Sequence, residues 1–326
     1  MRGGYRPRAS GPLTPRSIAA DYTAAMDRAP IPWINRRSLY EGRLFEIGHV
    51  TCRPTPEIRH EVDYPSLNVL ALPIAGVFAL HEGPRKQLLA TPNHAVFISS
   101  GVPYKVTFPG NVGDDCLTMR LTPEGLSQLV PQAMAGDGFD ASIRATRAAL
   151  PPAAILARGL LTRQLLQAET DPRLGDPLLI EELGVGLLDC ALGAEYRLDP
   201  PKGRHVERAK EAMATAPERK WALAELAGIA CVSPSHLAHA FSREVGTSVY
   251  RYAIRLRLAR ALDAVLDSNI DLTSIALDSG FASHSHFTAR FRAFFGLTPD
   301  ALRRSARSGQ AAELRRIVTA LPALAA

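Results

Sequence analysis

The chain has 326 residues, of which 46% are apolar and 21% charged, with a net charge of +6 and a pI near 9.3. This composition is typical of a soluble globular protein of two or three domains and excludes a disordered chain. No run of about 18 apolar residues occurs, which excludes a membrane-spanning helix.

Residues 1–30, where arginines stand among Pro, Gly and Ser, are expected to form a flexible basic tail without an apolar stretch of secretory length. The four cysteines, Cys52, Cys116, Cys190 and Cys231, lie far apart, with no CxxC and no nearby histidine cluster. This spacing argues against a disulfide framework or a structural zinc site. Reduced thiols in a cytoplasmic protein are the simpler expectation.

Residues 31–198 are expected to form one domain with strands first and helices after them. Apolar runs separated by Gly, Pro, Asn and Asp predict strands at residues 44–53, 67–80, 87–89, 95–99, 104–108 and 116–121. Many short strands at such spacing indicate a β-barrel or a β-sandwich. Helical apolar spacing follows at residues 123–134, 152–168 and 177–196. The apolar stripe of the last helix would be buried either in its own domain or against a second subunit.

This N-terminal half lacks the residue patterns of known catalytic sites. His49, His60, His81 and His94 are scattered, without the clustering that a metal site requires. Glycine motifs for phosphates or dinucleotides and a serine-nucleophile motif are also missing. The charged run at residues 59–64 resembles a solvated surface more than a pocket. We therefore expect no enzyme activity, no cofactor and no metal, and the barrel interior is the default place for a small ligand.

A linker is predicted at residues 199–204 because Pro200 and Pro201 cannot continue a helix. An all-α domain is predicted over residues 205–308, followed by a tail at 309–326. Its helices are expected at residues 205–215, 222–230, 234–244, 248–267, 273–279, 284–295 and 299–306. Residues 202–326 contain 18 Lys and Arg against 11 Asp and Glu, so the positive charge gathers here. Such a local excess is expected of a protein that binds a polyanion.

An internal repeat divides this helical domain. Residues 223–232 match residues 272–281 at a spacing of 49, and residues 235–246 match residues 285–296 at a spacing of 50. Each copy is predicted to be a short helix, a tight turn and a longer helix. This is the helix-turn-helix pattern, in which the second helix enters the major groove of DNA. The helix between the copies would span about 30 Å, close to the ~34 Å of one DNA turn.

The second copy strongly resembles the second helix-turn-helix of the AraC/XylS family of bacterial transcription regulators. The matching residues are Ala276, Gly280, Phe281, Ser283, His286, Phe287, Phe291, Arg292, Gly296, Thr298, Pro299 and Arg303. Residues 233–237 and 241–246 resemble the first motif of that family, and residues 255–260 look like its linker helix.

The resemblance implies an α+β fold. An N-terminal cupin-like β-barrel with following helices would precede an all-α C-terminal domain, in which a long linker helix joins two helix-turn-helix motifs. The barrel of this family senses a small molecule and often dimerises. The resemblance also implies activation through RNA polymerase more often than repression.

Side chains opposite the apolar face of each second helix are the candidate DNA contacts, at 100° per residue. The predicted DNA-binding residues are Ser235, His236, Ala238, His239, Ser242, Arg243, His284, Ser285, Thr288, Ala289 and Arg292. Those near a helix N-terminus are expected to read base edges, whereas Arg243 and Arg292 are expected to bind phosphates. His236, like His286, lies at the edge of the apolar face, where a structural role within the motif is expected.

Three positions depart from the expected pattern. His239 and Ala289 stand where the family often has Arg, so direct reading of guanine would be weaker here and readout of DNA shape greater. Cys231 stands where the second motif has Gly280. If this turn requires a positive φ, a cysteine there stores strain. A small filler residue is a simpler interpretation of Cys231 than a redox group.

The sequence thus predicts a regulator that binds double-stranded DNA sequence-specifically and responds to a small effector, with a homodimer compatible with the family. One alternative is a metal-dependent cupin enzyme fused to a DNA-binding module. Another is a ligand-independent dimeric regulator whose barrel only dimerises. The effector, the operator, the sign of regulation and the oligomeric state are not specified by the sequence.

Overall fold

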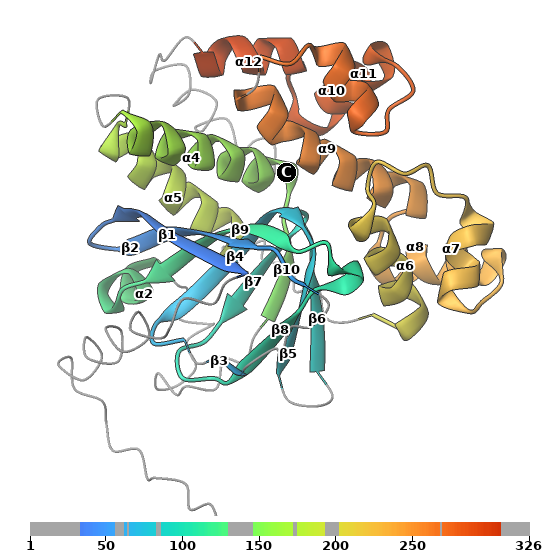
Figure 1. Ribbon diagram of the computed structural model, residues 1–326, viewed down its shortest axis with the longest axis horizontal. Coiled ribbons are helices and arrows are strands. Elements are labelled where there is room, and N and C mark those ends of the chain that lie inside the picture. The colour runs from blue at the N-terminus through green and yellow to red at the C-terminus, as the bar shows by residue number, and fades with distance from the viewer. Residues whose placement is uncertain are drawn as a thin grey trace, which may run out of the picture. The chain divides into compact units, whose positions relative to one another are not determined.

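The computed structural model describes residues 33–55, 62–63, 65–82, 86–129, 146–171, 175–192, 202–267 and 269–307 (Figure 1). The predicted tails at 1–30 and 309–326, residues 59–61 and 64 of the charged run, and linker residues 199–201 lie outside the described residues. Within these described residues, strands, three α-helices and one short 3-10 helix come first, and the part after residue 202 is helical.

The larger sheet has six antiparallel strands in the order β1-β2-β9-β4-β7-β10. They are β1 (Ile34–Glu41), β2 (Phe45–Cys52), β9 (Asp114–Leu121), β4 (Asn68–Gly76), β7 (His94–Ile98) and β10 (Thr146–Ala149). Alternate side chains of each strand point to opposite faces. Phe45 and Ile47 therefore pack into a core with helices, whereas Cys52 packs toward the second sheet.

The second sheet has four antiparallel strands in the order β3-β8-β5-β6. They are β3 (Val62–Asp63), β8 (Tyr104–Thr107), β5 (Phe78–Glu82) and β6 (Lys86–Ala90). Leu80 and Leu88 pack against Ala71, Val96 and residues beside them in the first sheet. The described strands thus form two facing sheets and do not join into one closed barrel. The barrel prediction is corrected to its sandwich alternative, and apolar side chains of the two sheets pack against one another.

Most of the predicted strands are present, and the differences have physical reasons. The apolar run at 67–80 forms β4 and β5, but β4 continues through Pro73, because its register shifts between Pro73 and Ala75 and so accommodates a residue without an N–H. The turn falls at Gly76, whose φ is +77°. Strands β1, β3 and β10 were not predicted. They are polar or very short, so their apolar periodicity is weak.

Three helices accompany the sheets: α2 (Pro123–Leu129), α4 (Pro152–Thr170) and α5 (Pro177–Leu192). Residues 130–134 of the first predicted helix lie outside the described residues. Helix α5 packs closely on β2, since a Cβ at Gly184 would lie 2.4 Å from the ring of Phe45. Leu179, Leu183, Leu187 and Leu188 of this helix are buried within this chain, whereas Leu178 is exposed.

Helix α4 is buried on all sides over most of its length. Every residue from Ala153 to Leu165 is buried, including Arg158 and Arg163. One side packs with the sheet and α5, and another packs with α9 (Val249–Asp267). A Cβ at Gly159 would lie 2.8 Å from Leu262 on α9, so glycine permits this close approach.

The helical part begins with α6 (Arg204–Thr215), α7 (Leu223–Ala230) and α8 (Pro234–Val245), continues through α9, and ends with α10 (Leu272–Asp278), α11 (His284–Phe295) and α12 (Pro299–Arg307). All seven predicted helices are present, with ends that differ by at most one residue. Helix α6 starts at Arg204, inside the predicted linker. No helix of the described residues is long and apolar enough to cross a membrane.

Candidate nucleic-acid interface

The two turns of the repeat have the same backbone geometry. After α7, the amide of Val232 donates to the carbonyl of Ala227 at 3.0 Å, and after α10 the amide of Phe281 donates to that of Ala276 at 2.9 Å. This bond requires a left-handed residue before it. Gly280 has φ +82° and Cys231 has φ +59° and ψ +43°. The turn thus requires a positive φ at this position. Cys231 is therefore strained, as expected from the sequence for a turn of this kind.

Replacing Cys231 by glycine is expected to stabilise the protein. A non-glycine residue in this conformation costs about 1–2 kcal/mol, while the added freedom of glycine in the unfolded chain offsets about 0.5–1 kcal/mol. A net gain of about 0.5 kcal/mol is expected in chemical denaturation. Cys231→Ala is the matched control, because it also removes the thiol but keeps the strain. Equal stability of the two variants would contradict the strain.

The two longer helices, α8 and α11, have twelve residues each and matching ends. The hydroxyl of Ser233 accepts the amide of His236 at 3.2 Å, and that of Ser283 accepts the amide of His286 at the same distance. Gly246 and Gly296 end the helices in the left-handed conformation. Local capping therefore fixes both helices at equivalent residues.

Aromatic packing fixes the buried side of each helix. On α8, Phe241 lies 5.4 Å from the ring of Tyr252 of α9. On α11, Phe291 lies 5.4 Å from Phe287 and 4.6 Å from Phe295. Phe294 of the same helix is only half-buried, whereas Phe295 is fully buried.

Two arginines hold the loops before the motifs. The sequence did not indicate this role. Arg257 donates to the carbonyls of Pro217 at 2.9 Å and Arg219 at 2.8 Å. Arg303 does the same for Val265 at 3.0 Å and Ile270 at 2.8 Å. Burial lowers the pKa of both guanidinium groups, but arginine starts high enough to stay cationic. Each loop is thus fastened by the helix that follows its motif.

The predicted DNA-binding side chains lie on the outer faces of α8 and α11. Nine are exposed: Ser235, His236, His239, Ser242, Arg243, His284, Ser285, Ala289 and Arg292. Ala238 and Thr288 are half-buried, and the Thr288 hydroxyl lies 3.4 Å from Nε2 of His284. Arg243 lies 3.3 Å from the carboxylate of Glu244.

The two equivalent histidines differ. His286 is half-buried beside the ring of Phe281 at 5.6 Å, in agreement with the expected structural role. His236 is exposed, and its ring lies 5.1 Å from that of His205 on α6. His205 in turn lies 3.6 Å from Glu244, whose pKa is held below its usual value mainly by the backbone N–H of Gly203.

Arg290 is not among the predicted DNA-binding residues, but it joins α11 to α9. Its Nε donates to His286 at 3.4 Å, and its guanidinium lies 5.9 Å from the ring centre of Tyr250. Both Arg290 and Tyr250 are exposed. A cation–π pair so far apart in sequence gives no periodic signal, so sequence reasoning missed it.

The histidines of the sheets serve separate hydrogen bonds. His49 accepts from Arg37 at 2.9 Å, His81 lies 2.8 Å from the hydroxyl of Thr107, and His94 lies 2.9 Å from that of Thr91. Among the described residues, no group of three His, Cys, Asp or Glu side chains is placed to hold a metal ion. His60 lies outside the described residues.

Comparison with known proteins identifies the helical part. A family model described as a helix-turn-helix domain matches residues 226–305. The HTH-type transcriptional regulator ArgR of Pseudomonas aeruginosa is 35% identical over 89 residues, which are 27% of each chain. A putative AraC-like transcription regulator of Streptomyces lividans is 36% identical over 83 residues, 26% of this chain and 27% of the other. The chain thus spans about a quarter of the length of these two relatives.

One similarity extends further. The probable transcriptional regulator LumQ of Photobacterium leiognathi is 24% identical over 257 residues, 73% of this chain and 96% of the other. Residues 226–305 form an AraC-type helix-turn-helix domain, the class that the duplicated, capped helices define. The AraC/XylS resemblance inferred from the sequence is confirmed.

Proposed function

We propose that this protein regulates transcription by binding double-stranded DNA in a sequence-specific manner, with α8 and α11 as recognition helices. The observation that carries the proposal is the duplicated motif, whose two helices have equal length, equal caps and polar outer faces. The nineteen residues of α9 between the motifs span about 28 Å at about 1.5 Å per residue. That length suits two helices in successive major grooves on one side of the duplex.

Selection of bound fragments from genomic DNA by the purified full chain tests this function. A recurring motif should emerge, and a footprint on it should cover about two helical turns per monomer. Recovery of random fragments with no common motif would contradict sequence-specific binding.

Base-reading and phosphate-binding side chains should respond differently to substitution. His239→Ala and Thr288→Ala are expected to relax the preference at particular bases by about 1–3 kcal/mol. Arg292→Ala should weaken binding to all sequences alike and reduce the salt slope by about one unit. Competition binding with single-base operator variants, repeated across a salt series, measures both effects.

The exposed Arg43 on the sheet half is the control for this series, and Arg43→Ala should leave both quantities unchanged. If Arg292→Ala altered the preference at one base only, its assignment to a phosphate would be wrong.

The remaining assignments extend this proposal. The sheet half is proposed to bind a small effector and to support dimer formation, and contact with RNA polymerase and activation follow from the family. The domain division at residues 31–198 and 205–308 is kept as part of the proposal. Similarity to LumQ across both halves supports a regulator in which the sheets belong to the same functional unit as the motifs.

A further inference from the structure

Arg290 lies on the side of α11 that faces the start of α9. Its Nε donates to Nε2 of His286 at 3.4 Å, and its guanidinium group lies 5.9 Å from the centre of the Tyr250 ring. Tyr250 is the second residue of α9, the helix that follows α8 directly along the chain. Arg290 therefore connects the second proposed recognition helix to the segment that leaves the first one.

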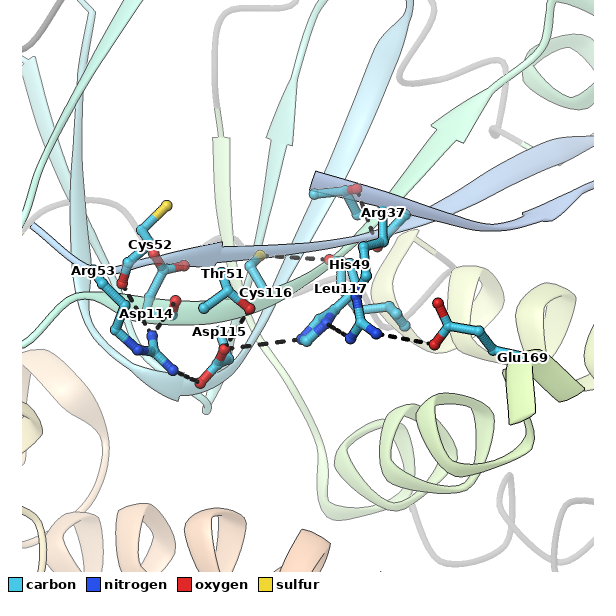
Figure 2. Close-up of polar contacts among 12 residues, drawn as sticks. Arg37, His49, Thr51, Cys52, Arg53, Asp114, Asp115, Cys116, Leu117 and Glu169 are labelled. Atoms are coloured by element: carbon cyan, nitrogen blue, oxygen red, sulfur yellow. Dashed lines mark hydrogen bonds and ion pairs between the residues drawn. The ribbon is translucent and has the colours of Figure 1, made fainter. Parts of the chain in front are cut away.

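The positive charge of Arg290 is not neutralised by a carboxylate. Figure 2 shows two arginines of the sheet half that are neutralised, Arg37 by Glu169 at 3.0 Å and Arg53 by Asp115 at 2.9 Å. Among the described residues, Arg290 has no carboxylate partner, and its contacts are an imidazole and a phenol ring. Its charge therefore remains available to an external anion.

The fold of the motif does not require an arginine at this position. The equivalent residue of the first motif, at a spacing of 50, is Ala240, which is 1% exposed. Arg290 is exposed instead, and the Tyr250 residue beside it is 53% exposed. The two copies share their caps and their buried aromatic side but not this charge. The difference indicates a role for Arg290 outside the packing of the motif.

The two contacts hold the guanidinium group without using all of its donors. His286 accepts only from Nε, so the terminal nitrogens keep their N–H groups for a ligand. The face of the Tyr250 ring attracts the cation. A side chain that is already held loses less conformational freedom when it binds. A guanidinium group in this state is well suited to the oxygens of a phosphate.

The position of Arg290 on α11 indicates which part of DNA it would meet. Two recognition helices in successive major grooves leave a minor groove between them, and its phosphate backbones face the protein. Ala289 lies in the middle of the outer face of α11, whereas Arg290 lies about 100° further round the helix, toward α9. A side chain on this flank is placed to reach the backbone at the edge of the groove rather than a base edge.

We propose that Arg290 binds a backbone phosphate of the operator between the two major grooves, with Tyr250 and His286 as positioning residues for its guanidinium group. The inference rests on the proposed function, because it needs α8 and α11 to be the recognition helices. A phosphate contact fixes the register of a protein on the duplex without reading a base. Arg290 thus links the register of α11 to the end of the first motif through α9.

Replacing single phosphates of the selected operator by neutral methylphosphonates, and measuring binding of the full chain, tests the proposal. Neutralising one phosphate between the two half-elements should weaken binding of the parent protein about tenfold. Arg290→Met should weaken binding to the unmodified operator by a similar factor and reduce the salt slope by about one unit. The same methylphosphonate should then cause little further loss, because the contact is already absent.

Arg292→Met is the matched control on the same helix. It should also weaken binding, but it should keep the sensitivity to the phosphate between the half-elements. Tyr250→Leu removes the ring that holds the guanidinium group, so it should produce part of the Arg290→Met loss, whereas Tyr250→Phe should not. In the Arg290→Met background, Tyr250→Leu should add nothing. All four residues changed or compared here are exposed or half-buried, so the variants are expected to fold.

Unchanged sensitivity of Arg290→Met to every methylphosphonate between the half-elements would overturn the proposal. A changed preference at particular bases would also overturn it, because Arg290 would then read a groove. Either result would leave sequence-specific binding by the parent protein intact. Failure of the parent protein to select any common motif would instead contradict the proposed function and this inference with it.

Discussion

Gly280→Ala is expected to destabilise the second helix-turn-helix motif by roughly 2–5 kcal/mol, because two costs add. The residue has φ +82°, which alone costs an alanine about 1–2 kcal/mol. A Cβ there would also lie 2.1 Å from the carbonyl oxygen of Glu218, far inside contact distance. Arg257 donates to the carbonyls of Pro217 and Arg219, the two neighbours of Glu218, so the loop that carries Glu218 cannot easily move away.

Gly246→Ala is the matched control, since that glycine has φ +74° but a Cβ there would meet nothing within 4 Å. Gly246→Ala should lower the free energy of unfolding by about 1–2 kcal/mol, from the backbone conformation alone. Urea denaturation of both variants measures the difference. Equal losses would show that the contact between the turn and Glu218 carries no cost.

Arg147→Met is expected to cost about 3–5 kcal/mol, the range for breaking a buried ion pair from one side. The Arg147 side chain is fully buried in β10, where it donates to the carbonyl of Leu89 at 2.7 Å and pairs with Glu207 of α6 at 3.1 Å. Burial acts to raise the pKa of Glu207, but Lys210 and Arg147 outweigh it and hold the pKa below its usual value. In Arg147→Met, the ionised carboxylate of Glu207 would therefore lose Arg147, one of its main partners.

The pH profile gives an independent readout of this ion pair. Because the pKa of Glu207 is lowered in the folded state, its contribution is present above its ordinary pKa near 4.5 and is lost as pH falls through the folded value. The stability of the Arg147 variant should therefore fall less on acidification than that of the parent protein. Arg43→Met, which breaks an exposed pair with Glu124, should cost little at any pH. Similar losses for the two variants would contradict the assigned role of Arg147.

The helical part could be predicted closely because its signals are local. Ser233, Ser283 and Asp271 cap helices within three residues of themselves, and Pro234 and Pro299 stand in first turns. The internal repeat then indicated that each motif is a short helix, a tight turn and a longer helix. The strands were predicted from their apolar alternation, but pairing such as Ile34 with Cys52 depends on residues that no local pattern connects.

The site was predicted in part for the same reason. The residues on the outer faces of α8 and α11 could be predicted because helical periodicity places them opposite the buried Phe241 and Phe287. The role of Arg257 and Arg303 was missed because they donate to carbonyls 33 to 40 residues away. Arg53, Asp115 and Arg260 likewise come to line one cavity between the sheets and α9 only after these elements have packed.

The burial of α4 on all sides has a mechanical consequence. From Ala153 to Leu165 this helix packs against the sheet on one side and against α9 on another, so this stretch has no exposed surface along which it could slide or tilt. Displacement of α9 would expose Gly159 and leave Arg163 without the carbonyl of Leu266. Thermal loss of either half should therefore carry the other with it, as one melting transition rather than two.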